Sequence, residues 1–333
     1  MAALRADEGT TRTPQQPLLR SKLDPHLHAI AFDLAKSGEP SRSRALQELA
    51  SAIASVEREG LRSAVALGHS LFTAEHQRPR QLKAMPAFAG DLLDPTQTGG
   101  DILIELSADN DSELRASCEA LIAALPKRWS VRWQLNGQRS DNRSQSGKGL
   151  ARNPFHFTEG FGNPASQRDI ADRTVVRPDQ GEPAWAVGGM YQVVRIVRLA
   201  TELWDKDSVE EQERIIGRRR DGRWLDGTPV GEEPNFAADP QGRLTPLDSH
   251  VRLAAPDRRN PPPIVRRGYS YDRGEGDMGL IFSCFQRDLV KGFEAVQKRL
   301  EGEAMAKYML TTGGGYFFVP PLGDAWIDRA FRQ

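Results

Sequence analysis

The sequence predicts an α+β fold made of two similar units, each a sheet with helices on one side. A buried-type strand over residues 101–107 (DILIELS) is followed by a capping acid and a helix with one apolar face. The same order recurs over residues 279–285 (GLIFSCF), where Asp288 precedes a second helix of this kind. Each half also contains an earlier helix and flanking strands, and a chain of 333 residues has room for two units.

The elements of the first half follow from hydrophobic spacing and from residues that end helices. Over residues 41–59, apolar residues recur every three or four positions, and Gly60 ends the helix. Asp111 or Ser112 caps the next helix, which ends before a proline. Apolar or alternating runs predict strands over residues 64–67, 101–107 and 129–135, with loop and short helical pieces over residues 70–98.

The second half opens with a strand over residues 190–199 and a short helix near residues 208–216, capped by Asp207 or Ser208. Residues 217–263 are rich in Arg, Gly and Pro and show little periodicity. A loop of this length inside a compact domain is usually functional or disordered. A helix follows the strand over 279–285, and a strand over residues 316–319 closes the fold.

These elements define the expected domains. Residues 1–40 are expected to be a flexible N-terminal tail, with His26 and His28 on the surface. The four segments are the tail (1–40), a first unit (41–165), a polar connection (166–187) and a second unit (188–333).

Composition excludes several classes of partner. The formal net charge is zero, so neither a nucleic-acid partner nor a membrane-surface partner is expected. Two cysteines are too few for a disulfide framework or a structural zinc site. No apolar run has the length of a membrane span, and the N-terminus lacks the apolar core of a secretion signal. We therefore expect a cytoplasmic protein.

A candidate site lies in residues 152–164, RNPFHFTEGFGNP, where Phe, Gly and Pro surround a single acid, Glu159. Glycine permits tight turns and proline stiffens its neighbours, so the acid is held in a loop walled by aromatic surface. Such surroundings can raise the pKa of a carboxyl and make it useful for moving protons. The alternative is a surface turn with an ordinary solvated Glu.

The long Arg-rich loop contains a second candidate, His250. A neutral imidazole there could ligate iron or copper, but no second ligand stands at zinc-site spacing. One axial His is sufficient if a porphyrin supplies the other ligands. The alternative is a hydrogen-bonded loop residue. The arginines at Arg218 and Arg266 either form a solvated basic face or pair with anionic groups such as propionates or peroxide oxygen.

Several stretches together resemble the DyP-type (dye-decolorising) haem peroxidase family. The stretch RNPFHFTEGFGNP is similar to that family's Gly-x-x-Asp-Gly loop with its following Asn-Pro. The others follow in the family's order: QERIIGRRR, SHVRLAAP, IVRRGYSYD, GLIFSCFQRDL and GGGYFFVPP. The resemblance extends from about residue 60 onward and is strongest from residue 150.

The resemblance implies two ferredoxin-like units whose antiparallel sheets carry their helices on the outside. It also implies one haem b per chain, held mainly by the second unit. His250 matches the proximal iron ligand and Arg266 the distal arginine. Arg218 matches an arginine near a haem propionate, and Phe282 matches an aromatic residue on the distal face.

Three positions depart from the family pattern. Glu159 stands where the family has its distal Asp, which changes the reach of the carboxylate. His156 stands where the family has the first Gly, so that it hydrogen-bonds Glu159, contacts the haem edge or restricts the pocket. Lys307 occupies a position where the family commonly has an acid that supports the proximal His. Glu303 and Asp248 are the candidates to replace that acid.

The function implied is a peroxidase that reduces hydrogen peroxide and oxidises a small organic electron donor, such as a dye or a phenolic compound, by one-electron steps. Glu159 would transfer the peroxide proton, and Arg266 would stabilise the developing negative charge. Trp204 or Tyr269, expected on the surface, would relay electrons from bulky donors. We expect a homo-oligomer. The alternatives are a haem-dependent oxidase or oxygenase of specialised metabolism, and a non-catalytic haem-binding protein.

Overall fold

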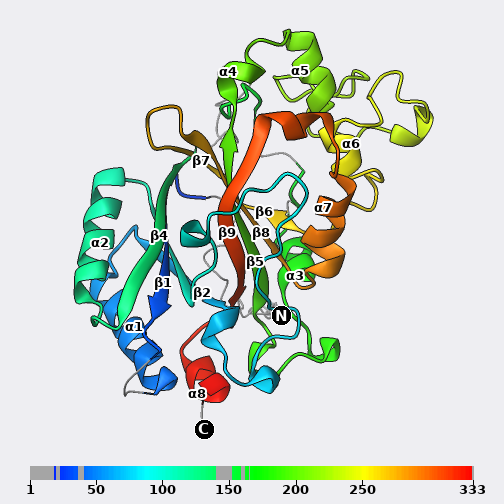
Figure 1. Ribbon diagram of the computed structural model, residues 1–333. Helices are drawn as coiled ribbons and strands as arrows, with labels where there is room; N and C mark the ends of the chain where they lie inside the picture. The colour runs from blue at the N-terminus through cyan, green and yellow to red at the C-terminus, as the bar shows by residue number, and fades with distance from the viewer. Residues whose placement is uncertain are drawn as a thin grey trace, which may run out of the picture.

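In the computed structural model, the strands form one antiparallel sheet that closes into a barrel (Figure 1). The structure describes residues 19, 23–36, 41–139, 152–158, 162–164 and 166–331. Around the barrel the strand order is β5-β9-β2-β3-β1-β4-β7-β8, and β8 pairs back onto β5. The short strand β6 is added beside β8.

The first unit has the order βαββαβ. Its elements are β1 (His26–Leu34), α1 (Arg42–Val56), β2 (Arg62–Gly68), β3 (Ile102–Ala108), α2 (Asp111–Ala124) and β4 (Trp129–Gln138). Within the sheet these strands lie in the order β4-β1-β3-β2, which is the ferredoxin-like arrangement.

The second unit repeats that arrangement with the order β9-β5-β8-β7. Its strands are β5 (Met190–Leu199), β6 (Val265–Arg266), β7 (Tyr269–Asp272), β8 (Met278–Gln286) and β9 (Met309–Val319). Its helices, with the connecting helix α3, are α3 (Gln167–Thr174), α4 (Thr201–Trp204), α5 (Val209–Ile216), α6 (His250–Ala254), α7 (Ala295–Arg299) and α8 (Ala325–Phe331). Pairing of β2 with β9 and of β4 with β7 joins the two units. The predicted α+β fold is confirmed.

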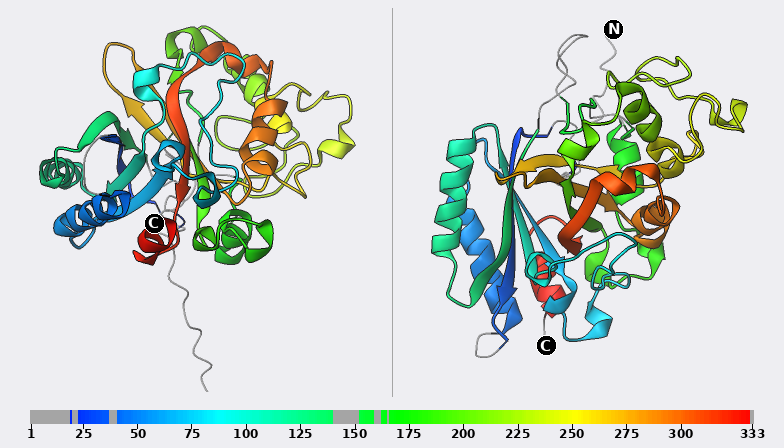
Figure 2. Two further views of the ribbon diagram at one scale, coloured as in Figure 1. Left: turned by 60° about the horizontal axis from the view of Figure 1, so that its bottom comes forward. Right: turned by 45° about the horizontal axis from the view of Figure 1, so that its top comes forward.

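The helices lie on the outside of the barrel (Figure 2). Helices α1 and α2 pack against each other over the first unit, and α6 and α7 lie over the second. The segment between α5 and β6, which includes α6, runs over one end of the barrel. This end therefore carries most of the long Arg-rich segment that the sequence predicted as a loop.

The buried strand residues divide into two apolar layers because successive side chains point to opposite faces. The layer inside the barrel contains small residues such as Ala29, Ala31 and Ala66 beside larger ones such as Trp133 and Phe317. The outer layer packs under the helices and contains Ile30 and Phe32 of the same strand β1. Small inner side chains are needed because the strands enclose a narrow space.

The predicted flexible tail is wrong for residues 26–34, which form strand β1 between β3 and β4. His28 is buried, and burial lowers the pKa of its imidazole. Alternation was hard to recognise because both faces of β1 are buried and its inner face is mostly alanine. The proposed boundaries between the later domains stay predictions.

Three further differences are local. The cap of α2 is Asn110, whose side chain accepts a hydrogen bond from the Glu113 N–H, in place of the expected Asp111 or Ser112. The helix after β8 begins as a π-helical turn, Val290–Glu294, with non-helical torsion angles at Gly292. The last strand starts at Met309, earlier than predicted, so the glycine run lies within it.

Glu105 on β3 is a buried acid inside the barrel. Gln192 on β5 donates one Nε2 hydrogen bond to Glu105 Oε1 at 3.1 Å and another to Ser283 Oγ at 3.1 Å. A cavity of about 30 Å³ adjoins Glu105, and its lining includes Asp24, Arg62 and Arg267. Burial raises the pKa of the Glu105 carboxyl to about 7.

We expect Glu105→Gln to remove a pH-dependent loss of stability. An unfolded Glu releases its proton near its ordinary pKa of 4.5, whereas the folded carboxyl keeps it to about pH 7. The free energy of unfolding is therefore highest below the unfolded pKa and falls by about 3 kcal/mol as pH rises through the folded pKa. Gln resembles the neutral acid, so the variant should exceed the parent in stability at about pH 8 but not at about pH 5.

Urea unfolding of the haem-loaded protein at both pH values measures this difference. Glu119→Gln, which changes an exposed acid on α2, is the matched control. If Glu105→Gln leaves the pH dependence of the parent intact, the pKa of the Glu105 carboxyl is not raised in the folded protein.

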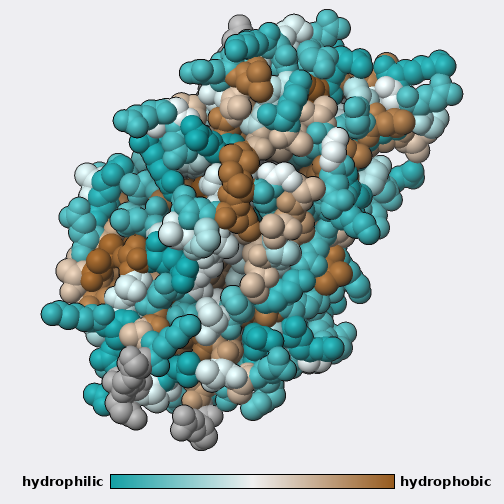
Figure 3. All heavy atoms as spheres, in the orientation of Figure 1, coloured by the Kyte–Doolittle hydropathy of each residue, from teal (hydrophilic) through white to brown (hydrophobic). Residues whose placement is uncertain are grey.

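Hydrophobic side chains on the face shown in Figure 3 form small, separate groups in a mostly hydrophilic surface. Among the described residues, none of the helices combines the length and the apolar character that crossing a bilayer requires.

Candidate functional site

His250 is the first residue of α6, and its ring lies against a buried acid from the segment before β9. Nδ1 of His250 is 2.7 Å from Oε2 of Glu303. The Glu303 side chain is 3% exposed and that of His250 is 28% exposed. This geometry suits an Nδ1–H that donates to the carboxylate, and no described residue hydrogen-bonds Nε2. The accessible nitrogen is therefore the one that can bind a metal.

Close packing of α5 against α6 places His250. Gly217 ends α5 with φ of 90°, and a Cβ there would lie 2.6 Å from Ser249 Oγ and 2.6 Å from Val251 Cγ2. No larger residue fits between these helices. Arg252, two residues further along α6, is buried and donates to the carbonyls of Thr245, Phe236 and Asp239. It thereby ties the long loop to the helix that carries His250.

The loop over residues 152–158 is a tight turn. Asn153 Oδ1 accepts hydrogen bonds from the N–H groups of Phe155 at 3.1 Å and Phe157 at 3.0 Å, and both Phe rings are buried. His156 between them has φ of 70°, which is the left-handed conformation that favours glycine. Glu159 lies outside the described residues.

His156 points its ring to Asp205, just after α4. Its Nε2 is 2.7 Å from Asp205 Oδ1, and its side chain is about half exposed. The hydrogen bond to Asp205 was not among the alternatives that the sequence suggested. The predicted contact of His156 with a cofactor stays a prediction.

Arg218 connects the end of α5 with this loop. Its Nη2 donates to the Thr158 carbonyl at 2.6 Å, and its guanidinium lies 5.9 Å from the centre of the Phe157 ring. The Thr158 N–H in turn donates to the Arg220 carbonyl. Arg218 and Arg220 of QERIIGRRR thus contact Phe157 and Thr158 of RNPFHFTEGFGNP, two of the stretches that carry the resemblance.

Arg266 on β6 lies against the last part of the same stretch. The Arg266 N–H donates to Asn163 Oδ1 at 2.8 Å, and Asn163 Nδ2 donates to the Arg266 carbonyl at 2.9 Å. A Cβ on Gly162 would lie 2.9 Å from Arg266 Nη2, so the guanidinium packs directly over that glycine.

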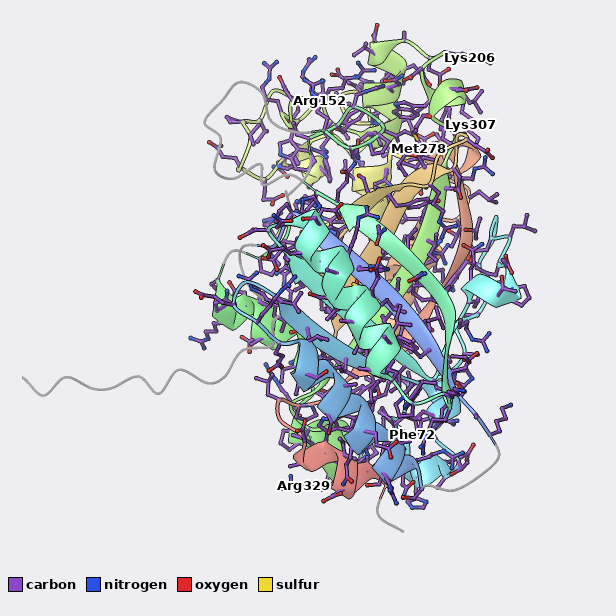
Figure 4. The ribbon with its side chains drawn as sticks, turned by 90° about the vertical axis from the view of Figure 1, so that its left-hand side faces the viewer. Phe72, Arg152, Lys206, Met278, Lys307 and Arg329 are labelled. Carbon is purple, nitrogen blue, oxygen red and sulfur yellow. The ribbon has the colours of Figure 1, made fainter. Side chains whose placement is uncertain are left out.

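An apolar cluster joins the loop over residues 152–158 to the elements around His250. Phe155, Phe157 and Met305 belong to it, and Val251 and Phe282 pack against it. The cluster therefore connects the loop, the residue after His250, the segment after Glu303 and the predicted aromatic position on β8. Figure 4 shows Arg152, Met278 and Lys307 at one end of the barrel, far from Phe72 and Arg329 at the other.

The expected surface positions of Trp204 and Tyr269 are wrong. Trp204 is 0% exposed, because its ring stacks on Phe155 and its Nε1–H donates to the Phe155 carbonyl. Tyr269 is 4% exposed, because it lies inside the barrel with its hydroxyl donating to the Asp24 carbonyl. Neither side chain is available for direct contact with a bulky donor.

Of the two acids proposed to support His250, the structure places Glu303 beside it. Asp248 is exposed. Lys307 lies 3.9 Å from Asp207 and over the Tyr308 ring, so it does not take the place of the acid. Within the described part of the chain, no group of three or more His, Cys, Asp or Glu side chains could hold a metal.

Two family descriptions match consecutive parts of the chain. "Dyp-type peroxidase, N-terminal" matches residues 20–139, and "Dyp-type peroxidase, C-terminal" matches residues 150–324. The deferrochelatase of Shigella flexneri serotype 5b is 39% identical over 297 residues, which cover 83% of this chain and 70% of that protein. The deferrochelatase of Escherichia coli K12 is 39% identical over 282 residues, with coverage of 79% and 66%.

Solved structures agree with these matches. A DyP-type peroxidase from Streptomyces coelicolor superposes with a TM-score of 0.82 and 29% identity, covering 94% of both chains. Ferric DtpA from Streptomyces lividans gives 0.79 and 30% identity, covering 90% of both chains. The chain belongs to the DyP-type peroxidase family and is a haem-dependent peroxidase.

Proposed function

We propose that His250 binds the iron of haem b through Nε2 and that Glu303 orients and polarises its ring. The 2.7 Å contact between His250 Nδ1 and Glu303 Oε2 is the observation that carries this assignment. A ligating His commonly donates its other N–H to a carboxylate, which determines the tautomer and raises the basicity of the ligand.

The described residues fit a haem group. No described residue hydrogen-bonds Nε2 of His250. The next residue, Val251, packs against an apolar cluster that Phe282 on β8 also contacts. Arg218 lies at the edge of the same cluster and has the charge to pair with a propionate. One haem per chain agrees with the assignment, which rests on one His–Glu pair in the described part of the chain.

When bound, haem supplies an iron at which hydrogen peroxide is reduced and from which oxidising equivalents pass to a donor. The guanidinium of Arg266 would stabilise negative charge that develops on peroxide oxygen. Glu159 would accept the peroxide proton and return it to the leaving oxygen. Its role stays a prediction, since it rests on the sequence alone.

The donors that we propose are dyes and phenolic compounds, oxidised one electron at a time. The burial of Trp204 and Tyr269 favours donors that reach the haem or its edge directly. A homo-oligomeric state and a cytoplasmic location stay predictions from the sequence.

The first test is the absorption spectrum of protein expressed with haem precursor, before and after one equivalent of peroxide. A ferric haem band that changes with peroxide and returns as a phenolic donor is oxidised supports the proposal. A haem band that ignores peroxide would favour the specialised oxidase or oxygenase. Absence of haem would overturn the assignment of His250.

A second candidate activity comes from the relatives named deferrochelatase, at 39% identity. The name denotes removal of iron from a chelate. The test of this activity follows the haem-loaded protein without peroxide and measures the release of iron and the fluorescence of iron-free porphyrin. Accumulation of intact porphyrin would support this activity, whereas constant haem during donor oxidation would support peroxidase turnover alone.

We expect Glu303→Gln to lower the second-order rate with peroxide by about ten- to a hundredfold, the usual cost of losing an outer partner of a metal ligand. Gln is close in size but carries no negative charge, so the His250 ring becomes less electron-rich. The reduction potential of the haem should rise for the same reason. Stopped-flow kinetics and potentiometric titration measure the two effects.

Glu301→Gln, an exposed acid in the same segment, is the matched control. A Glu303→Gln variant with the reduction potential of the parent would show that Glu303 has only a packing role.

A further inference from the structure

We infer that Asn163 is a positioning residue that holds Arg266 for the reaction with peroxide. This inference rests on the proposed role of Arg266. The observations that carry it are two hydrogen bonds from one side-chain amide and the packing of the guanidinium over Gly162.

Strand β6 consists of Val265 and Arg266 and pairs with β8 on one side. The N–H of the next residue, Arg267, donates to the Ser283 carbonyl on β8. Because backbone groups alternate in direction along a strand, the N–H and C=O of Arg266 point away from β8. The backbone of Arg266 therefore needs partners on its outer side.

The Asn163 amide supplies both partners. Oδ1 accepts the Arg266 N–H at 2.8 Å, and Nδ2 donates to the Arg266 carbonyl at 2.9 Å. An amide has one acceptor and one donor group side by side, so it can take the place of a neighbouring strand. Asp, Ser and Ala lack this combination at neutral pH.

The same segment also positions the end of the Arg266 side chain. Gly162 has φ of 82°, and a Cβ at this residue would lie 2.9 Å from Arg266 Nη2. Asn163 thus determines the position of the strand, and Gly162 leaves the space into which the guanidinium packs. A shift of this backbone would move the guanidinium relative to the peroxide that it stabilises.

The test measures the second-order rate constant for the reaction with peroxide. It compares the haem-loaded parent with haem-loaded Asn163→Ala, Arg266→Ala and the double variant. We expect Arg266→Ala to lower this rate by about a hundred- to a thousandfold. Asn163→Ala should lower the rate by about ten- to a hundredfold, because a small displacement of a catalytic group reduces the rate by up to about a hundredfold. In the Arg266→Ala background the Asn163 change should have little further effect, because both act through one guanidinium.

Asn110→Ala, which removes a cap hydrogen bond on α2, is the matched control and should retain the parent rate. A parent rate for Asn163→Ala, or full additivity in the double variant, overturns the role of Asn163. A parent rate for Arg266→Ala overturns the proposed role of Arg266 and this inference with it. The two failures are therefore distinguishable.

Asn163→Asp provides a second readout that does not depend on the fold of the Ala variant. The ionised carboxylate presents an oxygen to the Arg266 carbonyl, whereas the protonated acid again offers a donor and an acceptor. The rate relative to the parent should rise as pH falls towards about 4, the ordinary pKa of an Asp carboxyl. If the rate of Asn163→Asp relative to the parent does not change with pH, the inference is overturned.

Discussion

Replacing His250 with Ala is expected to abolish stable haem binding and to lower the second-order rate with peroxide by more than about a hundredfold. Loss of an outer partner of a metal ligand costs up to about a hundredfold, and loss of the ligand itself should cost more. The substitution removes the one imidazole nitrogen that the assignment gives to the iron. The substitution also removes Nδ1 of His250, the hydrogen-bond partner of the Glu303 carboxyl, whose side chain is 3% exposed. Haem content per chain and stopped-flow kinetics measure the result.

His76→Ala is the matched control, because His76 is exposed in a short helical turn of the first unit. Added imidazole should restore part of the haem band to His250→Ala, since the free ligand can occupy the space left by the side chain. Full haem content and parent kinetics in His250→Ala would contradict the assignment.

Replacing Arg266 with Ala should lower the peroxide rate by about a hundred- to a thousandfold while haem stays bound. The guanidinium is not assigned to the iron, so its loss affects charge stabilisation and not the cofactor. Arg266→Lys should recover only part of the rate, because an ammonium keeps the charge but lacks the planar fork of the guanidinium. Stopped-flow kinetics over a range of peroxide concentrations separates binding from the chemical step.

Arg259→Ala, an exposed arginine in the long segment before β6, is the matched control. Equal rates for Arg266→Ala and the parent would show that another group stabilises the negative charge. Loss of haem from Arg266→Ala would instead indicate that the arginine holds a propionate.

The sequence predicted the repeated order of strand, capping residue and helix, and the structure shows why that order was visible. Strands such as β3 and β5 are buried on both faces and mostly apolar, and α2 has a single apolar face. Strand β1 was missed because the narrow interior of the barrel requires Ala29 and Ala31, which carry little hydrophobic signal. Strands β6 and β7 are short and lie beside Arg-rich loop, so they have no periodicity to detect.

Within the site, the sequence alone indicated the chemical types: an imidazole at His250, arginines at Arg218 and Arg266, and an aromatic residue at Phe282. Their identity as a set came from motifs whose order is preserved along the chain. The sequence left two acids open as partners for His250, because 53 residues separate His250 from Glu303. Proximity across such a separation depends on how η10, the helical turn Ala304–Tyr308 that follows Glu303, packs against α5, which in turn packs against α6. No local pattern encodes these contacts.

The amino-acid sequence by itself determined the fold class, the family and the residue types that can bind haem and act on peroxide, because these follow from local periodicity and short motifs. Only the tertiary structure decided that Glu303 supports His250, that His156 turns to Asp205, and that Trp204 is buried. It also revealed the Asn163 amide as the outer partner of Arg266. These contacts join segments far apart in the chain, so closure of the barrel and packing of the long loop across its end create them.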